Sequence, residues 1–157
     1  MGDVVGKIIG VILSAILCII APLVIVVMSD DMSDRRILFA EITSLVDEIV
    51  DTGEITNEQL VDFYTAVSSH GPICEVRIVR KMRAANMNTE GKVEITYMPI
   101  DVTVGALGKD VLETFNTGDL VNVRVAAVDY SGMQKAGRAF LGGFLKPIDL
   151  QIEARVR

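Results

Sequence analysis

The chain has 157 residues, of which 50% are hydrophobic and 5% aromatic, and its formal net charge is −6. Its mean hydropathy of +0.43 is high, and the excess lies in residues 8–28, which contain no charged residue. About 129 residues remain beyond this run, enough for one folded domain. These features exclude a freely soluble cytoplasmic enzyme, a multi-pass transporter and a disordered tail.

The apolar run predicts a membrane span. Its 21 residues form a helix of about 32 Å, which matches the roughly 30 Å hydrocarbon core of a bilayer. The run is too long for the apolar region of a signal peptide, and no A-x-A cleavage pattern follows it. We therefore expect a permanent single-pass span in the cytoplasmic membrane, with the amino terminus inside. Residues 1–32 would form this span and its junction, and residues 33–157 a domain outside the cytoplasm.

Small residues recur every fourth position along the start of the chain, at Gly2, Gly6, Gly10, Ser14 and Cys18. This spacing, called the ladder below, leaves a groove along one helix face in which a second helix can pack closely. The alternative is that these are the ordinary glycines of a membrane helix. Pro22 lies deep in the run and removes one backbone donor, so we expect it to kink the helix.

Two amphipathic helices follow the span. Ser33 can cap a helix that runs to about Asp51, although no Gly or Pro separates it from the span and the two can form one long, bent helix. Its apolar stripe comprises Leu38, Ile42, Leu45, Val46 and Ile49. Thr52 and Gly53 end this helix. Residues 56–59, Thr-Asn-Glu-Gln, form a capping box for a second helix that stops before His70 and buries Leu60, Phe63, Tyr64 and Val67.

Alternating apolar and polar residues predict strands in the second half of the chain. The apolar sets are Cys74, Val76 and Ile78; Val93, Ile95 and Tyr97; Val121, Val123 and Val125; and Ile148, Leu150, Ile152, Ala154 and Val156. We expect a hairpin loop over residues 84–92, a short helix over residues 109–115, and a short helix or ordered loop over residues 133–145. Together these elements predict an α+β domain with four antiparallel strands packed on the helices.

Charge is unevenly distributed along the chain. Residues 29–69 hold ten acidic residues against two arginines, a net charge of −8, whereas residues 70–92 sum to +3. The acidic block argues against nucleic acid as a partner, which needs a basic surface. The opposite charges of the two blocks favour contact between copies of the chain, with an ordinary solvated surface as the alternative.

No residues predict catalysis, a metal or a cofactor. The Gly105–Asp110 segment has the wrong spacing for a phosphate loop, with Asp after Lys109 where Ser or Thr is required. The single His70 lies in a predicted turn. Asp30, Asp31 and Asp34 are explained by a solvated helix start. The two cysteines, Cys18 and Cys74, lie in the span and in the outer domain, so we expect no disulfide within one chain, and we expect Cys74 to be buried.

The order of elements and several short motifs resemble a known family. The segment Asp47–Thr56, followed by Phe63-Tyr64, Gly71, Cys74-Glu75-Val76 and Gly118-Asp119, resembles the TadE-like pilins and pseudopilins of bacterial tight-adherence and related type IV filament systems. The resemblance implies an envelope protein whose span anchors it in the membrane and can enter a filament core. It implies no cofactor and no catalytic residue. Pilins of this class usually carry an acidic residue just inside the mature span, whereas here no Glu follows the possible cleavage sites Gly6 and Gly10.

The sequence therefore predicts a pilin-like structural subunit of a bacterial surface filament or its assembly complex. Its partners would be copies of itself or related pilins, the lipids of the cytoplasmic membrane, and a filament assembly platform. Two alternatives stay open. One is a single-pass accessory protein of a secretion or conjugation complex, and the other is a membrane-tethered binding module.

Overall fold

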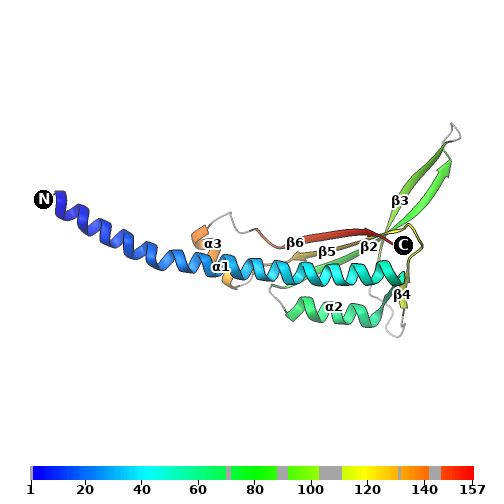
Figure 1. The fold of residues 1–157 in the computed structure, drawn as a ribbon, viewed down its shortest axis with the longest axis horizontal. Helices are drawn as coiled ribbons and strands as arrows, with labels where there is room; N and C mark the ends of the chain where they lie inside the picture. The colour runs from blue at the N-terminus through cyan, green and yellow to red at the C-terminus, as the bar shows by residue number, and fades with distance from the viewer. Residues whose placement is uncertain (1, 70–71, 88–91, 103–110, 131, 142–145) are drawn as a thin grey trace.

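The computed structural model describes residues 2–69, 72–87, 92–102, 111–130, 132–141 and 146–157. It confirms an α+β fold in which one long apolar helix at the amino terminus leads into a small domain with antiparallel sheets (Figure 1). The elements in chain order are α1 (Gly2–Thr52), β1 (Glu54–Thr56), α2 (Asn57–Ser69), β2 (Cys74–Met87), β3 (Val93–Asp101), β4 (Val111–Thr114), β5 (Leu120–Ala127), α3 (Gly132–Leu141) and β6 (Asp149–Arg155).

Helix α1 is continuous over 51 residues, so Ser33 lies inside it and caps nothing. Residues 29–33 hold neither Gly nor Pro, the two residues that disfavour a helix interior most, so the helix continues through them. Val27 is the first buried residue of α1, at 2% exposed. The predicted apolar stripe is confirmed beyond it, since Leu38, Ile42 and Ile49 are fully buried. Gly53 then ends the helix with φ of 71°, a conformation that favours glycine.

Helix α2 begins with the predicted capping box. The Thr56 backbone N–H donates to Gln59 Oε1 at 2.8 Å, and the Gln59 backbone N–H donates to Thr56 Oγ1 at 3.2 Å. These two bonds satisfy donors that the first helical turn leaves free. Leu60, Phe63 and Val67 are buried in the shared core, as the sequence predicts, whereas Tyr64, also predicted to be buried, is only partly buried against it. His70 falls outside the described residues.

The main sheet has four antiparallel strands in the order β3-β2-β5-β6. Its inner face packs on α1, because Val121, Val123 and Val125 of β5 are fully buried and α1 contacts both β5 and β6. The final strand follows its predicted alternation: Ile148 and Val156 are buried, and the apolar residues between them are partly buried. The outer face points away from α1 and carries polar side chains.

A second, two-stranded sheet closes the far end of the domain, where β1 pairs antiparallel with β4. The predicted helix over residues 109–115 is therefore wrong in its described part, because Val111–Thr114 is a strand. Four residues are too few to distinguish a helical from a strand period. The pairing with β1 therefore determines that this segment is a strand. The Phe115 N–H extends the pairing by donating a hydrogen bond to the Gly53 carbonyl at 2.7 Å.

Strand β2 is longer than predicted and projects beyond the core. Residues 84–87, expected in a loop, continue β2 and pair with β3 up to Met87 and Val93. Strand β5 pairs with β2 only as far as Lys81. Residues 82–87 of β2 and 93–98 of β3 thus form a two-stranded ribbon, the arm, which stands away from the rest of the domain (Figure 1).

Two further expectations were right in part. Helix α3 occupies residues 132–141 of the segment 133–145, whose last four residues lie outside the described part. Cys74 lies in a strand but is only half-buried, because it is the first residue of β2. Its thiol donates to the Pro72 carbonyl at 3.3 Å. Burial, and secondarily the charge of Asp34, raises the pKa of the Cys74 thiol.

Candidate functional site

The amino-terminal half of α1 extends beyond the domain with no core of its own (Figure 1). Every described side chain from Val4 to Ile19 is exposed, including Val11 at 70% and Ile19 at 71%. Within the described part of the chain, α1 is the one helix that is long and apolar enough to cross a membrane. Aliphatic side chains exposed to this extent over several turns need lipid or protein around them.

The ladder lies on this protruding half. A Cβ atom placed on Gly6 or on Gly10 would meet nothing within 4 Å beyond the adjacent residues and the backbone of its own helix. Further along, Gly10, Ser14 and Cys18 line a shallow groove together with Lys7, Val11 and Ala15. Gly2 begins α1, and nothing is described of its surroundings. In a single copy, the small residues of the ladder therefore leave this face of the helix without bulky side chains and uncovered. The role of the ladder in packing stays a prediction.

Pro22 lies inside α1 without ending it. Proline has no N–H, so the Cys18 carbonyl four residues earlier loses its helical hydrogen bond. The helix curves gently along its amino-terminal half in Figure 1, while the helical assignment continues through Pro22. A single proline within a span thus leaves the helix long enough to reach the domain.

A polar cluster fixes the junction between the protruding half and the domain. Asp31 is 9% exposed. It accepts hydrogen bonds from Arg35 Nε at 2.8 Å and from Gln134 Nε2 at 2.5 Å. Arg35 Nη2 also donates to the Lys146 carbonyl at 2.6 Å. The interpretation of Asp31 as part of a solvated helix start is therefore wrong, since no helix starts there and the carboxylate joins α1 to α3. Arg35, which Asp31 holds, joins α1 to the segment before β6.

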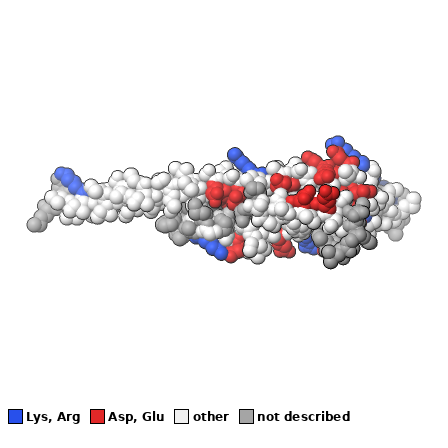
Figure 2. Space-filling view, turned by 90° about the horizontal axis from the view of Figure 1, so that it is seen from below, with Lys and Arg blue, Asp and Glu red and all other residues white. Residues whose placement is uncertain are grey.

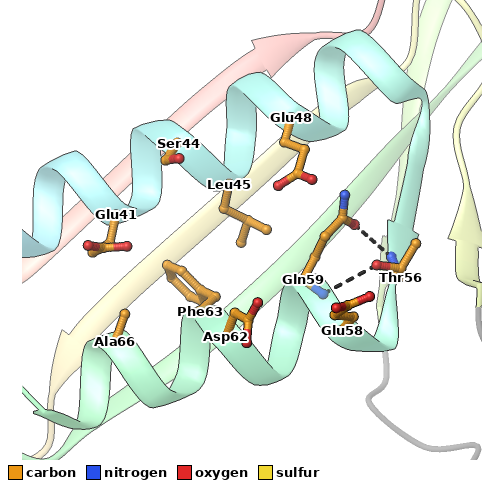
Figure 3. A pocket seen from close by; sticks show the side chains of 10 residues that line it. All are labelled: Glu41, Ser44, Leu45, Glu48, Thr56, Glu58, Gln59, Asp62, Phe63 and Ala66. Atoms are coloured by element: carbon orange, nitrogen blue, oxygen red, sulfur yellow. Dashed lines mark hydrogen bonds between the residues drawn. The ribbon is translucent and has the colours of Figure 1, made fainter.

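The second surface of interest is a groove of about 610 Å³ between α1 and α2, named here the α1–α2 groove. It is lined by Glu41, Ser44, Leu45, Glu48, Thr56, Glu58, Gln59, Asp62, Phe63 and Ala66 (Figure 3). Leu45 and Phe63 supply an apolar floor, and each is 4% exposed. Figure 2, which views the molecule from the side of α2, shows acidic side chains gathered over this part of the domain.

Four of the groove residues are acidic and none is basic: Glu41, Glu48, Glu58 and Asp62. Within the described part of the chain, none of these carboxylates forms an ion pair. The groove therefore combines a negative rim with an apolar floor. The sequence indicated the acidic block, but only the pairing of α1 with α2 brings residues 41–48 and 58–62 to one place.

A buried ion pair elsewhere holds the end of the main sheet to β4. Asp119 Oδ2 accepts from Arg80 Nε at 2.9 Å and Nη2 at 2.7 Å, and Glu113 Oε1 accepts from Arg80 Nη1 at 2.6 Å. The backbone N–H groups of Arg83 and Asn116 also donate to Asp119. Every member is satisfied within the domain, so this cluster stabilises the fold.

No group of three or more His, Cys, Asp or Glu side chains able to hold a metal ion occurs in the part of the chain that the structure describes. The Gly105–Asp110 segment lies outside that part. No protein-family model matches the sequence, and no curated protein and no solved structure matches it. Three exposed surfaces of the described residues remain as candidate functional surfaces: the protruding half of α1, the α1–α2 groove and the arm.

Proposed function

We propose that this chain is a pilin-like structural subunit of a bacterial surface filament or of its assembly complex. The observation that carries the proposal is α1 itself. One uninterrupted helix has an exposed apolar half before Val27 and a half buried against the sheet after it. This arrangement suits a subunit that is stored in a bilayer and then packs its apolar half against that of other copies. The resemblance to TadE-like pilins supports the same function.

In this proposal the two halves of α1 have separate roles. The protruding half is anchored in the cytoplasmic membrane, with the ladder providing the face on which copies approach closely. The domain lies outside the cytoplasm and displays its sheet and its α1–α2 groove to neighbouring subunits. Copies of the chain or related pilins, lipids and an assembly platform are the expected partners.

Electron microscopy of material sheared from the cell surface tests this function. We expect filaments that an antibody against the domain labels along their length, because each subunit would display its domain on the filament surface. Two strains serve for comparison: one that lacks the chain, and the same strain with the chain expressed again from a plasmid. A chain that stays wholly in the membrane fraction, with no labelled filament, would instead indicate an accessory protein or a tethered binding module.

The orientation of the span gives a separate prediction. Asn57 is exposed at the start of α2, within the domain. A cysteine placed there by Asn57→Cys is expected to react in intact cells with a maleimide that does not cross membranes, after any outer membrane has been made permeable. The unmodified chain, with Cys18 in the span and Cys74 half-buried, gives the background. Labelling that requires cell lysis would place the domain inside.

A further inference from the structure

The outer face of the arm is apolar and uncovered. Antiparallel register places Met87 opposite Val93 and Ala85 opposite Ile95 on this face. Met87 is 81% exposed, Val93 64% and Ile95 46%. A two-stranded ribbon is marginal in water without a packing surface, and contiguous exposed apolar side chains mark an interaction site. The arm therefore needs a partner that its own domain does not supply.

The charges beside this apolar patch indicate the chemistry of that partner. Over the centre of the sheet, the outer face is neutralised by ion pairs: Arg77 with Asp101, Lys81 with Glu153, and Arg124 with Asp149. At the arm this pattern ends. Arg83 lies opposite Tyr97, whose hydroxyl accepts a hydrogen bond from Arg155 at 2.9 Å.

Neither Arg83 nor Arg155 forms an ion pair with a carboxylate of the described residues. Arg83 on the arm and Arg155 on β6 beside it thus place two guanidinium groups that have no carboxylate partner among the described residues next to an apolar patch. A complementary partner surface would be apolar with several unpaired carboxylates around it.

The α1–α2 groove has the matching charge and a small apolar floor. Its floor of Leu45 and Phe63 is apolar, and its four carboxylates have no cationic partner among the described residues. The groove lies between the two helices, whereas the outer face of the arm points away from α1. One chain cannot bring the two surfaces together, but two copies can. Such a contact joins different surfaces of identical subunits, and this kind of contact repeats from copy to copy.

We propose that the outer face of the arm of one copy docks into the α1–α2 groove of a second copy. Met87, Val93 and Ile95 would cover the apolar floor, and Arg83 and Arg155 would pair with the carboxylates of the rim. The inference rests on the proposed function, because it supplies the contact between domains in an assembly whose spans pack through α1. It goes further by naming the two domain surfaces that meet.

Crosslinking between two differently tagged full-length chains in membranes tests the contact. One chain carries Ala85→Cys on the arm and the other Ser44→Cys in the groove, both at exposed positions. A short bismaleimide is expected to join them into a dimer that carries both tags. The control replaces Ser44→Cys by Gln151→Cys, which is exposed on the outer face of β6. The native cysteines are present in all variants and set the background.

Charge reversal tests whether the contact depends on the proposed pairs. Arg83→Glu on the arm-bearing copy is expected to lower the yield of crosslinked dimer about tenfold, and Asp62→Arg on the groove-bearing copy should restore it. Arg36→Glu makes the same charge change on α1 outside both surfaces and should leave the yield unchanged. A yield that Arg83→Glu does not lower would overturn the proposal.

Two other results would also overturn it. One is an arm-to-groove yield no higher than that of the Gln151→Cys control. The other is a stronger crosslink between two Ala85→Cys copies, which would indicate that two arms pair with each other. Self-crosslinking of Ser14→Cys in the span reports association of α1 separately. Strong crosslinks at Ser14 without an arm-to-groove contact would leave the proposed function standing and refute this inference alone.

Discussion

Gly10→Leu is expected to lower the association of the spans about tenfold, which corresponds to about 1.4 kcal/mol, because the ladder face would no longer allow close packing of helices. Lipid and Leu are equally apolar, so burying apolar side chains between spans contributes little to the free energy of their association. Close approach of the two backbones contributes more, through van der Waals packing. A Leu side chain would fill the ladder at its centre. The multimer fraction of the full-length chain in membranes, measured by crosslinking at Ser14→Cys, gives the result.

The single copy should tolerate this substitution. Beyond its neighbours and the backbone of its own helix, nothing lies within 4 Å of a Cβ atom at Gly10, and the added side chain carries no charge. Membrane insertion and folding of the domain are therefore expected to survive. Ile12→Leu is the matched control, because Ile12 lies on the side of α1 opposite Gly10 by the 100° helical rotation and is 54% exposed. Equal multimer fractions in the two variants would show that the ladder residues are ordinary glycines of a membrane helix.

Asp119→Ala should lower the free energy of unfolding of the domain by about 3–5 kcal/mol. Its carboxylate is 3% exposed and pairs with Arg80, which is 8% exposed. Removing it leaves a buried cation with one remaining carboxylate partner, Glu113, and leaves two backbone donors unpaired. The urea midpoint of the full-length chain in detergent, followed by circular dichroism, measures the loss.

Asp149→Ala is the control for the buried pair. Asp149 also accepts two hydrogen bonds from an arginine, Arg124, but both side chains are about half exposed. An exposed pair contributes at most about 1 kcal/mol, so the control should cost little. Equal losses from the two substitutions would contradict the structural role assigned to Asp119.

The same carboxylate makes stability depend on pH. Burial acts to raise the pKa of Asp119, but hydrogen bonds from the Arg83 N–H, the Arg80 side chain and the Asn116 N–H, with the charge of Arg80, lower it below its usual value. The stabilisation is thus present above the unfolded pKa of about 3.9 and is lost as pH falls through the lower pKa of the folded state. Urea midpoints from pH 7 to pH 3 should fall less steeply in Asp119→Ala.

Local patterns in the sequence predicted the elements that depend on neighbouring residues. The stripe of α1, the Thr56–Gln59 capping box and the alternation of β6 are each set within one helix or strand, where periodicity and hydrogen-bonding geometry decide. The end of α1 at Gly53 was predictable for the same reason. These elements were enough to obtain the fold class.

Long-range contacts account for what was missed. The burial of Asp31 depends on Gln134, which is 103 residues away in the sequence. From the sequence alone, an acidic residue at the end of a predicted span is expected to be exposed to water. The pairing of β1 with β4 joins two segments too short to have a period. The alternation at Val93 and Ile95 is typical of a half-buried strand. Both residues are exposed because β2 and β3 continue beyond Lys81, where the pairing of β2 with β5 ends, and the sequence of one strand does not reveal this.

The continuity of α1 has a mechanical consequence. The apolar run ends at Met28 and the first buried residue of α1 is Val27, so no flexible linker separates the protruding half of α1 from the domain. A flexible linker would extend when one end is displaced and would not move the other end. A continuous helix has a fixed rise of about 1.5 Å per residue, so a displacement of one end moves the other. Under the proposed function, tilting the protruding half in a membrane, or extracting it, would therefore turn or lift the domain with it. The Asp31–Gln134 hydrogen bond lies at this junction, and it would pass part of such a load on to α3.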